Sequence, residues 1–215
     1  MNEPQFVPGS CLVFDAMERL GIAPRLLDLR IKPLNPLDKE FGPLFTLKGI
    51  SNVTDAQKKS SRHFFEEIRA GEVVIVEVAG QAGIGHWGEL MSHGAMARGA
   101  QGVIVPGGCR DSLQVRELGF PVFCEYTSPF ESGSEYCIGE WQVPLALDGL
   151  RGQKVKCVPG DYVIADADGI IVIEEELVLD VMKMATEIND KEKLAILDMR
   201  NGGLINDAFV RNGVV

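Results

Sequence analysis

The sequence predicts an α/β fold with a central βαβαβ core, an antiparallel β section after it and a long C-terminal helix. Apolar runs alternate with helix-like segments between residues 73 and 124, which is typical of parallel strands joined by helices. Short β runs separated by glycine-containing turns follow between residues 141 and 173. Residues 174–200 then form one amphipathic segment that is long enough for a helix of several turns, with an apolar stripe of Leu177, Val181, Met184, Ile188, Leu194 and Leu197.

The composition is that of an ordinary globular protein. The chain has 215 residues, 46% of them hydrophobic and 24% charged, which suits one domain over residues 1–215. Its net charge of −10 argues against nucleic acid as the main ligand, because phosphate backbones need a basic face. No apolar run approaches the roughly 18 residues that span a membrane. Five scattered cysteines without a CxxC pair indicate reduced thiols, so we expect a cytoplasmic protein.

The first third of the chain is expected to lead into the core. Residues 1–8 resemble a loose arm, and residues 10–21 predict a helix with Ser10 as its N-cap. A proline-rich connection, residues 23–42, precedes a predicted strand at residues 43–50. A helix capped by Asp55 is then expected to run to residue 70.

The central core is predicted from apolar runs that end at glycines. The first strand is almost wholly apolar, which indicates burial on both faces. The pattern predicts parallel pairing with right-handed crossovers. The predicted order is strand 73–78, helix 89–97, strand 102–105, helix 112–118 with Asp111 as N-cap, and strand 120–124.

The composition changes after this core. Residues 128–140 are rich in Ser, Gly and Glu and predict a surface loop or hairpin. The antiparallel section is predicted from runs at residues 141–147, 154–158, 161–164 and 169–173. The tail, residues 201–215, carries apolar side chains that need cover, which a second subunit could provide.

Two turns at the ends of predicted strands hold the candidate catalytic residues Glu89, Arg110 and Asp111. Ligands of α/β proteins bind at the carboxyl ends of strands. The Arg110 guanidinium suits a carboxylate, which it binds through two hydrogen bonds. Asp111 suits Mg²⁺ or Mn²⁺, since such a cation needs few protein carboxylates and keeps several waters. In the alternative interpretation, Asp111 only caps a helix and Arg110 is a surface residue.

Glu89 precedes Arg110 by twenty intervening residues, which brings the starts of two helices together on a βαβ unit. Its carboxylate either orders the water shell of the metal or relays a proton. In the alternative interpretation, Glu89 is only a first-turn residue that the helix dipole favours. The backbone N–H groups of Gly88, Glu89, Leu90 and Met91 are expected to bind an anion, as helix N-termini do.

Three further side chains of this segment belong to residue types that can bind ligands or catalyse reactions. His86 lies in the glycine-rich turn and is expected near a ligand, whereas His93 is expected to be a packing or surface residue. Cys109 is expected to be a packed thiol, because no base partner is evident for a nucleophile. The GQAGIG segment does not match a dinucleotide-binding fingerprint.

Taken together, three segments resemble the RraA-like family. They are SCLVFDAMERLG at residues 10–21, WGELMSHGAMARGAQGVIVPGGCRDSLQVRELGFPVF at residues 87–123, and VPGDYVIADADGIIVI at residues 158–173. The family includes class II 4-hydroxy-4-methyl-2-oxoglutarate / 4-carboxy-4-hydroxy-2-oxoadipate aldolases and regulators of ribonuclease activity A. The resemblance implies a compact α/β sandwich of the swivelling β/β/α type.

The resemblance also implies a mechanism. The amides of residues 88–91 and Arg110 would hold the pyruvate moiety of a 2-oxo acid, and Asp111 would ligate Mg²⁺ or Mn²⁺. The metal would stabilise the enolate formed by retro-aldol cleavage or by decarboxylation of oxaloacetate. A homotrimer or hexamer is implied, with Glu187 or Glu192 of a neighbouring subunit taking part. The alternative within the family is a non-catalytic regulator that binds a ribonuclease or another protein.

Three departures from the family pattern bear on the substrate. Glu89 stands where the aldolases usually carry Asp, and Pro106 replaces an Asp before the glycine. The segment Cys124-Glu125-Tyr126 replaces a usual Ala-Arg-Gly, which removes a basic residue near the expected pocket.

Overall fold

The structure is a computed structural model that describes residues 6–133 and 135–214. The chain divides into two compact units, one of residues 25–175 and one that combines the N-terminal segment up to residue 24 with the segment from residue 176. All strands lie in the first unit. The single domain expected over residues 1–215 stays a prediction, and residues 1–5 of the expected arm lie outside the described residues.

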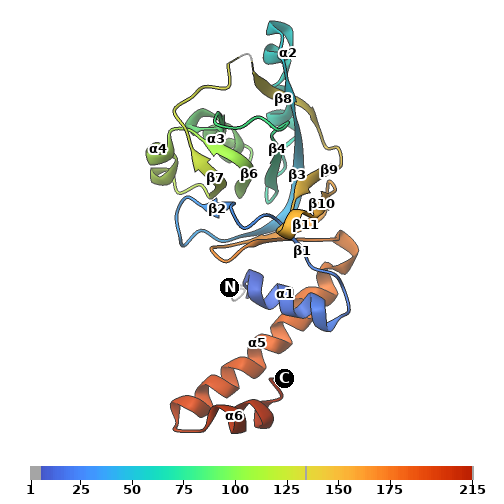
Figure 1. The fold of residues 1–215 in the computed structure, drawn as a ribbon, viewed down its shortest axis with the longest axis vertical. Coiled ribbons are helices and arrows are strands. Elements are labelled where there is room, and N and C mark those ends of the chain that lie inside the picture. The colour runs from blue at the N-terminus through green and yellow to red at the C-terminus, as the bar shows by residue number, and fades with distance from the viewer. Residues whose placement is uncertain (1–5, 134, 215) are drawn as a thin grey trace. The chain divides into compact units, whose positions relative to one another are not determined.

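Ten strands of the described part of the chain form one mixed sheet (Figure 1). Their order is β1-β12-β11-β3-β4-β6-β7-β2, with β5 beside β6 and β8 beside β3, while β9 and β10 pair separately. The strands are β1 (Arg25–Leu26), β2 (Lys32–Pro33), β3 (Glu40–Ser51), β4 (Val73–Glu77), β5 (Gly85–Trp87), β6 (Gly102–Cys109), β7 (Val122–Thr127), β8 (Tyr136–Trp141), β9 (Leu145–Asp148), β10 (Lys154–Cys157), β11 (Tyr162–Ala165) and β12 (Ile170–Ile173).

The predicted βαβαβ core is confirmed. Strands β4, β6 and β7 pair in parallel, joined by α3 (Glu89–Ala97) and α4 (Ser112–Glu117). The predicted antiparallel section is also present, because β11 pairs antiparallel with both β12 and β3. β3 is parallel to β4 and thereby joins the two parts into one sheet.

Strand β6 is longer than predicted. Its pairing with β7 shifts register between Val105 and Gly108, and Pro106 lies within this irregularity. Proline has no N–H to donate to a neighbouring strand, so the chain passes it as a bulge and then resumes pairing. The strand therefore ends at Cys109, four residues after the predicted end at residue 105.

Both faces of the sheet are covered, which is why its central strands are almost wholly apolar. Val74 and Val103 belong to the hydrophobic cluster that includes Ala95 of α3 and Val115 of α4. Their neighbours Ile75 and Ile104 belong to a second cluster with residues of β9 to β12, because successive side chains of a strand point to opposite faces. The layered α/β architecture that was expected is therefore present.

The helix predicted over residues 55–70 is wrong. The structure has a short helix, α2 (Asp55–Ser60), and a separate 3-10 helix, η1 (His63–Glu67). Thr54, not Asp55, caps α2, in a reciprocal pair of hydrogen bonds with Gln57. The hydroxyls of Ser60 and Ser61 donate to carbonyls three or four residues earlier, and such bonds compete with the helix and favour its end.

The second unit is helical. It contains α1 (Ser10–Arg19), α5 (Val178–Arg200) and α6 (Ile205–Asn212), and α1 and α6 both pack on α5 (Figure 1). Two further 3-10 turns complete the fold. η2 (Leu150–Gly152) lies in the first unit, and η3 (Glu175–Leu177) lies directly before α5.

Two expectations for this unit need correction. Gly9, not Ser10, occupies the N-cap position of α1. The segment expected as a tail contains the helix α6, which its sequence did not indicate. On α5, Leu194 and Leu197 of the predicted apolar stripe are each 54% exposed, whereas Val181 and Ile188 are buried. None of the described helices combines the length and the apolar character needed to cross a membrane.

Candidate functional site

The turn after β6 lies against the junction of β5 and α3. The backbone N–H of Arg110 donates to the carbonyl of Trp87 over 2.7 Å, which ties the two segments together. Gly88 is the N-cap residue of α3 and has no side chain to cap the helix. The structure therefore brings residues 88–89 beside Arg110 and Asp111, as the sequence predicted.

Asp111 does not cap α4, although it occupies the N-cap position. It adopts a left-handed backbone conformation, with φ 54° and ψ 38°, and its side chain makes no capping hydrogen bond. Instead, Oδ2 accepts the N–H of Glu89 over 3.4 Å, so the carboxylate faces the start of α3. A Cβ at Gly88 would lie 2.9 Å from this oxygen, so the missing side chain of Gly88 leaves room for the carboxylate.

The Arg110 side chain lies over Gly85, where a Cβ would come within 2.0 Å of its Cγ. Its Nε is buried and has no hydrogen-bond partner among the described residues. A buried guanidinium N–H without an acceptor is costly, and the group binds carboxylates with two parallel hydrogen bonds. An anionic ligand would supply the missing acceptor.

Arg110 and Asp111 line one cavity of about 330 Å³. Its other walls come from the start of α4 and from the end of β7, which the sequence did not indicate as part of the site. The lining residues are Cys109, Arg110, Asp111, Ser112, Thr127, Ser128 and Pro129. Thr127 reaches this place because β6 and β7 pair in parallel with Cys109 opposite Thr127, a register that no local motif shows.

The first turn of α3 contributes through its backbone. The N–H groups at the start of a helix have no intrahelical acceptor, and Asp111 accepts one of them, from Glu89. The side chains of Leu90 and Met91 line a different cavity, and Leu90 is 86% exposed. Within residues 6–133 and 135–214, no hydrogen bond or ion pair of the Glu89 carboxylate is seen.

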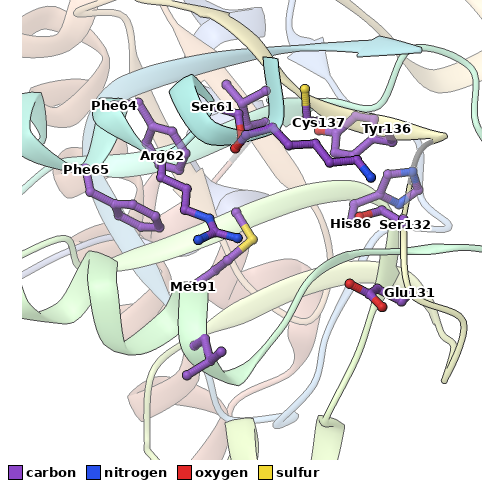
Figure 2. A pocket seen from close by; sticks show the side chains of 14 residues that line it. Ser61, Arg62, Phe64, Phe65, His86, Met91, Glu131, Ser132, Tyr136 and Cys137 are labelled. Carbon is purple, nitrogen blue, oxygen red and sulfur yellow. The ribbon is translucent and has the colours of Figure 1, made fainter. Parts of the chain in front are cut away.

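Figure 2 shows residues that line a second cavity, which has a volume of about 420 Å³ and shares no lining residue with the first. His86 forms part of its wall and is only 3% exposed. Its Nδ1 accepts the N–H of Gly108 over 3.1 Å, and burial lowers the pKa of the imidazole to about 4, so the ring is neutral near pH 7. His93 is exposed on α3, in agreement with its expected surface role.

Cys109 is a packed thiol, as expected. Burial raises its pKa to about 12, and the thiol donates to the carbonyl of Arg110 over 3.2 Å. A group that stays protonated at neutral pH is a poor nucleophile.

The segment that replaces a usual basic residue has a structural role. Glu125 pairs with Arg30 over 3.5 Å, and the hydroxyl oxygen of Tyr126 accepts the N–H of Gly83 over 2.7 Å. Cys124 is buried on β7. The segment thus holds the turn before β5 and adds no cation.

The donor set fits a hard divalent cation held by one carboxylate. Asp111 is exposed, and its side chain is not used to cap α4. Within the described ranges, no three His, Cys, Asp or Glu side chains gather into a metal cluster. One carboxylate with waters and a chelating ligand suits Mg²⁺, which retains much of its hydration. Glu187 and Glu192 lie on α5 in the other unit, so their expected role stays a prediction.

Comparisons with known proteins show the family to which the chain is similar. The model of the RraA-like family, described as Aldolase/RraA, matches residues 10–172. The chain is 30% identical over 195 residues to a protein of Halalkalibacterium halodurans named a putative 4-hydroxy-4-methyl-2-oxoglutarate aldolase, with 89% of the chain and 86% of that protein covered. It is 26% identical over 204 residues to protein DlpA of Legionella pneumophila, covering 93% of the chain but spanning only 31% of DlpA.

The fold is shared with solved structures of the same group. The crystal structure of RraAS2 from Streptomyces coelicolor, described as an unusual member of the RNase ES inhibitor RraA protein family, matches with a TM-score of 0.73 and 28% identity. The match covers 86% of the present chain and 89% of RraAS2. The expected fold type is therefore confirmed.

Proposed function

The chain belongs to the RraA-like family, and on that premise we propose that it is a lyase acting on a 2-oxo acid with a pyruvate unit. The reaction is retro-aldol cleavage of a substrate like 4-hydroxy-4-methyl-2-oxoglutarate, decarboxylation of oxaloacetate, or both. The observation that carries this proposal is the cavity shared by Arg110 and Asp111, in which the buried Nε of Arg110 has no acceptor among the described residues.

Substrate binding follows from the geometry of the two turns. The planar guanidinium of Arg110 binds the carboxylate of the pyruvate unit, and Gly85 leaves the space for its side chain. The N–H groups of Leu90 and Met91 at the start of α3 add donors for the same anion. The ligand then replaces water around Arg110 and satisfies its buried nitrogen.

A divalent cation completes the proposed site, with Asp111 as its protein ligand. When bound, Mg²⁺ or Mn²⁺ supplies a positive charge that stabilises the negative charge developing on the keto oxygen of the substrate. Asp111 is directed to this place by its left-handed backbone and by the N–H of Glu89.

The proton is assigned to Glu89. In retro-aldol cleavage the substrate hydroxyl loses its proton as the C–C bond breaks, and the electron pair of that bond stays on the pyruvate unit as an enolate. The enolate then takes up a proton at its methylene carbon. Glu89 lies on the first turn of α3, beside Asp111, and its carboxylate accepts the hydroxyl proton through water and returns a proton to the enolate; in decarboxylation the proton comes from water. The longer side chain, compared with the Asp usual in the aldolases, shifts the position of this water.

The test is pyruvate release by the purified protein with Mg²⁺ or Mn²⁺, and after EDTA. We expect activity that EDTA abolishes and added metal restores, and a fall of at least about 100-fold in Asp111→Ala. Arg116→Ala is the matched control, since Arg116 is an exposed residue of α4 outside the cavity, and it should retain the parental rate. Equal rates in Asp111→Ala and the parent would refute the proposed chemistry.

A second function is favoured by the likeness to RraAS2 and by the net charge of −10. The protein could act as a non-catalytic regulator, with an acidic surface that binds a basic ribonuclease or another protein. Such binding would not need the cavity. A pull-down with nuclease partners that is unchanged in the double variant Arg110→Ala/Asp111→Ala, together with no pyruvate release, would select this function.

We further propose assembly into a homotrimer or hexamer. Several large apolar side chains of α5 and α6, and that of Leu204 directly before α6, are more than half exposed in the single chain: Leu179, Leu194, Leu197, Leu204, Ile205 and Val210. Burial of such side chains against another subunit would remove them from water. Light scattering coupled to size exclusion should give three or six times the 23.4 kDa chain mass, and a monomer would contradict this assembly.

A further inference from the structure

His86 carries an unused hydrogen-bond donor in the second cavity. Its Nδ1 accepts the N–H of Gly108, so a neutral ring carries its proton on Nε2. Nε2 is buried and makes no hydrogen bond of good geometry with any described residue. Burial, which lowers the pKa of the imidazole, outweighs the effect of the Gln81 backbone, which lies close enough to raise it. A buried donor without an acceptor is costly, and in native proteins it commonly marks a ligand or an ordered water.

The walls of this cavity combine an apolar surface with a cationic edge (Figure 2). Phe64 and Phe65 lie on one side, and Tyr136 packs its ring edge-to-face with His86 at a centroid distance of 4.8 Å. The charged lining residues are Lys58, Arg62 and Glu131. In Figure 2, the Arg62 guanidinium points toward Met91.

The charge balance narrows the class of ligand. Two cations and one carboxylate leave a single excess positive charge, which matches a monoanion better than a phosphate dianion. The aromatic walls suit an apolar body, and about 420 Å³ is in the range of small-ligand pockets. The neutral imidazole supplies one directed N–H, which matches one acceptor oxygen.

We propose that this cavity is a second ligand site, which binds a small monocarboxylate with an aromatic or branched apolar body. One carboxylate oxygen accepts the Nε2–H of His86, the charge faces Lys58 and Arg62, and the apolar body lies against Phe64 and Phe65. The site is separate from the Arg110 cavity, because no residue lines both. It does not depend on lyase activity.

The first test follows the imidazole directly. Nitrogen-15 NMR of the full chain distinguishes the Nε2–H tautomer of His86 from the exposed His63 and His93. Titration with 3-phenylpropionate, without metal, should shift the His86 Nε2 and its proton in a saturable way and leave the other two imidazoles unchanged. The uncharged 3-phenylpropan-1-ol should bind at least about fivefold more weakly. The absence of a saturable His86 shift up to roughly 20 mM 3-phenylpropionate would overturn the proposal.

Variants then test whether the proposed contacts, and not a general loss of structure, account for the binding. His86→Leu should weaken 3-phenylpropionate binding at least about tenfold, and His86→Gln, which keeps a donor and an acceptor, should weaken it less. Lys58→Ala should weaken it about threefold, whereas Lys59→Ala, its exposed neighbour outside the cavity, should not.

Two results would contradict this site. Equal affinities for 3-phenylpropionate in Lys58→Ala and Lys59→Ala, with both variants folded by thermal unfolding, would show that Lys58 does not bind the carboxylate. Loss of binding in Arg110→Ala would place the ligand in the first cavity instead. Retained binding in that variant is the expected result.

Discussion

The two cavities, one lined by Arg110 and the other by His86, each have a buried nitrogen without a hydrogen-bond partner in the described structure, yet they differ in chemistry. The Arg110 cavity collects a guanidinium, a carboxylate and hydroxyls at the ends of parallel strands. The His86 cavity is lined mainly by aromatic and apolar side chains, with an imidazole that burial keeps neutral. The difference has a physical cause. A titratable side chain keeps its charge where solvent reaches it, whereas burial against aromatic rings favours its neutral form.

The largest expected effect concerns the charged cavity. Arg110→Ala should lower kcat/KM for pyruvate release by about 10³-fold, because it removes charge-assisted hydrogen bonds to the substrate carboxylate worth several kcal/mol. Arg110→Lys keeps the charge but loses the planar fork, so it should recover only part of the activity. Steady-state kinetics measure both, and a lysine variant with parental kcat/KM would show that charge alone matters there.

The next effect concerns the neutral imidazole and appears in stability. Since burial lowers the pKa of His86 from 6.5 to about 4, the unfolded chain takes up this proton first as the pH falls. The stability is therefore complete above pH 6.5 and is lost between pH 6.5 and pH 4, by up to about 3 kcal/mol. Urea unfolding of the parent and of His86→Gln at both pH values should show the extra loss only in the parent. The same loss in both proteins would mean that His86 is not held neutral.

A smaller effect should distinguish the roles of Arg110 and Asp111 in the charged cavity. In Gly88→Ala the new Cβ would lie 2.9 Å from Asp111 Oδ2, and in Gly85→Ala it would lie 2.0 Å from Arg110 Cγ. We expect Gly88→Ala to weaken Mn²⁺ binding about tenfold and Gly85→Ala to raise KM about tenfold, since each displaces a different side chain. Calorimetry with Mn²⁺ and the pyruvate assay measure the two effects. Identical changes in both variants would indicate a general distortion of β5.

Much of the fold could be predicted from local pattern, and its failures have physical causes. The helix over residues 89–97 is confirmed with its bounds, because Gly88 begins it and the apolar spacing is clear. The helix predicted to residue 70 failed, because serine hydroxyls compete for its carbonyls after Ser60. Strand β6 was predicted too short, because its bulge at Pro106 depends on pairing with β7.

The candidate site divides in the same way. Arg110 and Asp111 could be predicted, because adjacent charges at a strand end are visible in one stretch of sequence, and the structure places both on one cavity. Thr127, Ser128 and Pro129 could not, because they reach that cavity only through the register of β7 against β6. The cap assigned to Asp111 was wrong, because its backbone turns into the left-handed region and directs the carboxylate elsewhere.

That left-handed turn has one more consequence. Side chains other than glycine occupy this region at a cost of roughly 1 kcal/mol. Asp111 does not cap α4, and the hydrogen bond that its side chain accepts from the N–H of Glu89 is 3.4 Å long. Glycine at this position would relax the backbone and lose only that hydrogen bond. An acidic side chain on this strained, exposed corner therefore suits a role beyond folding.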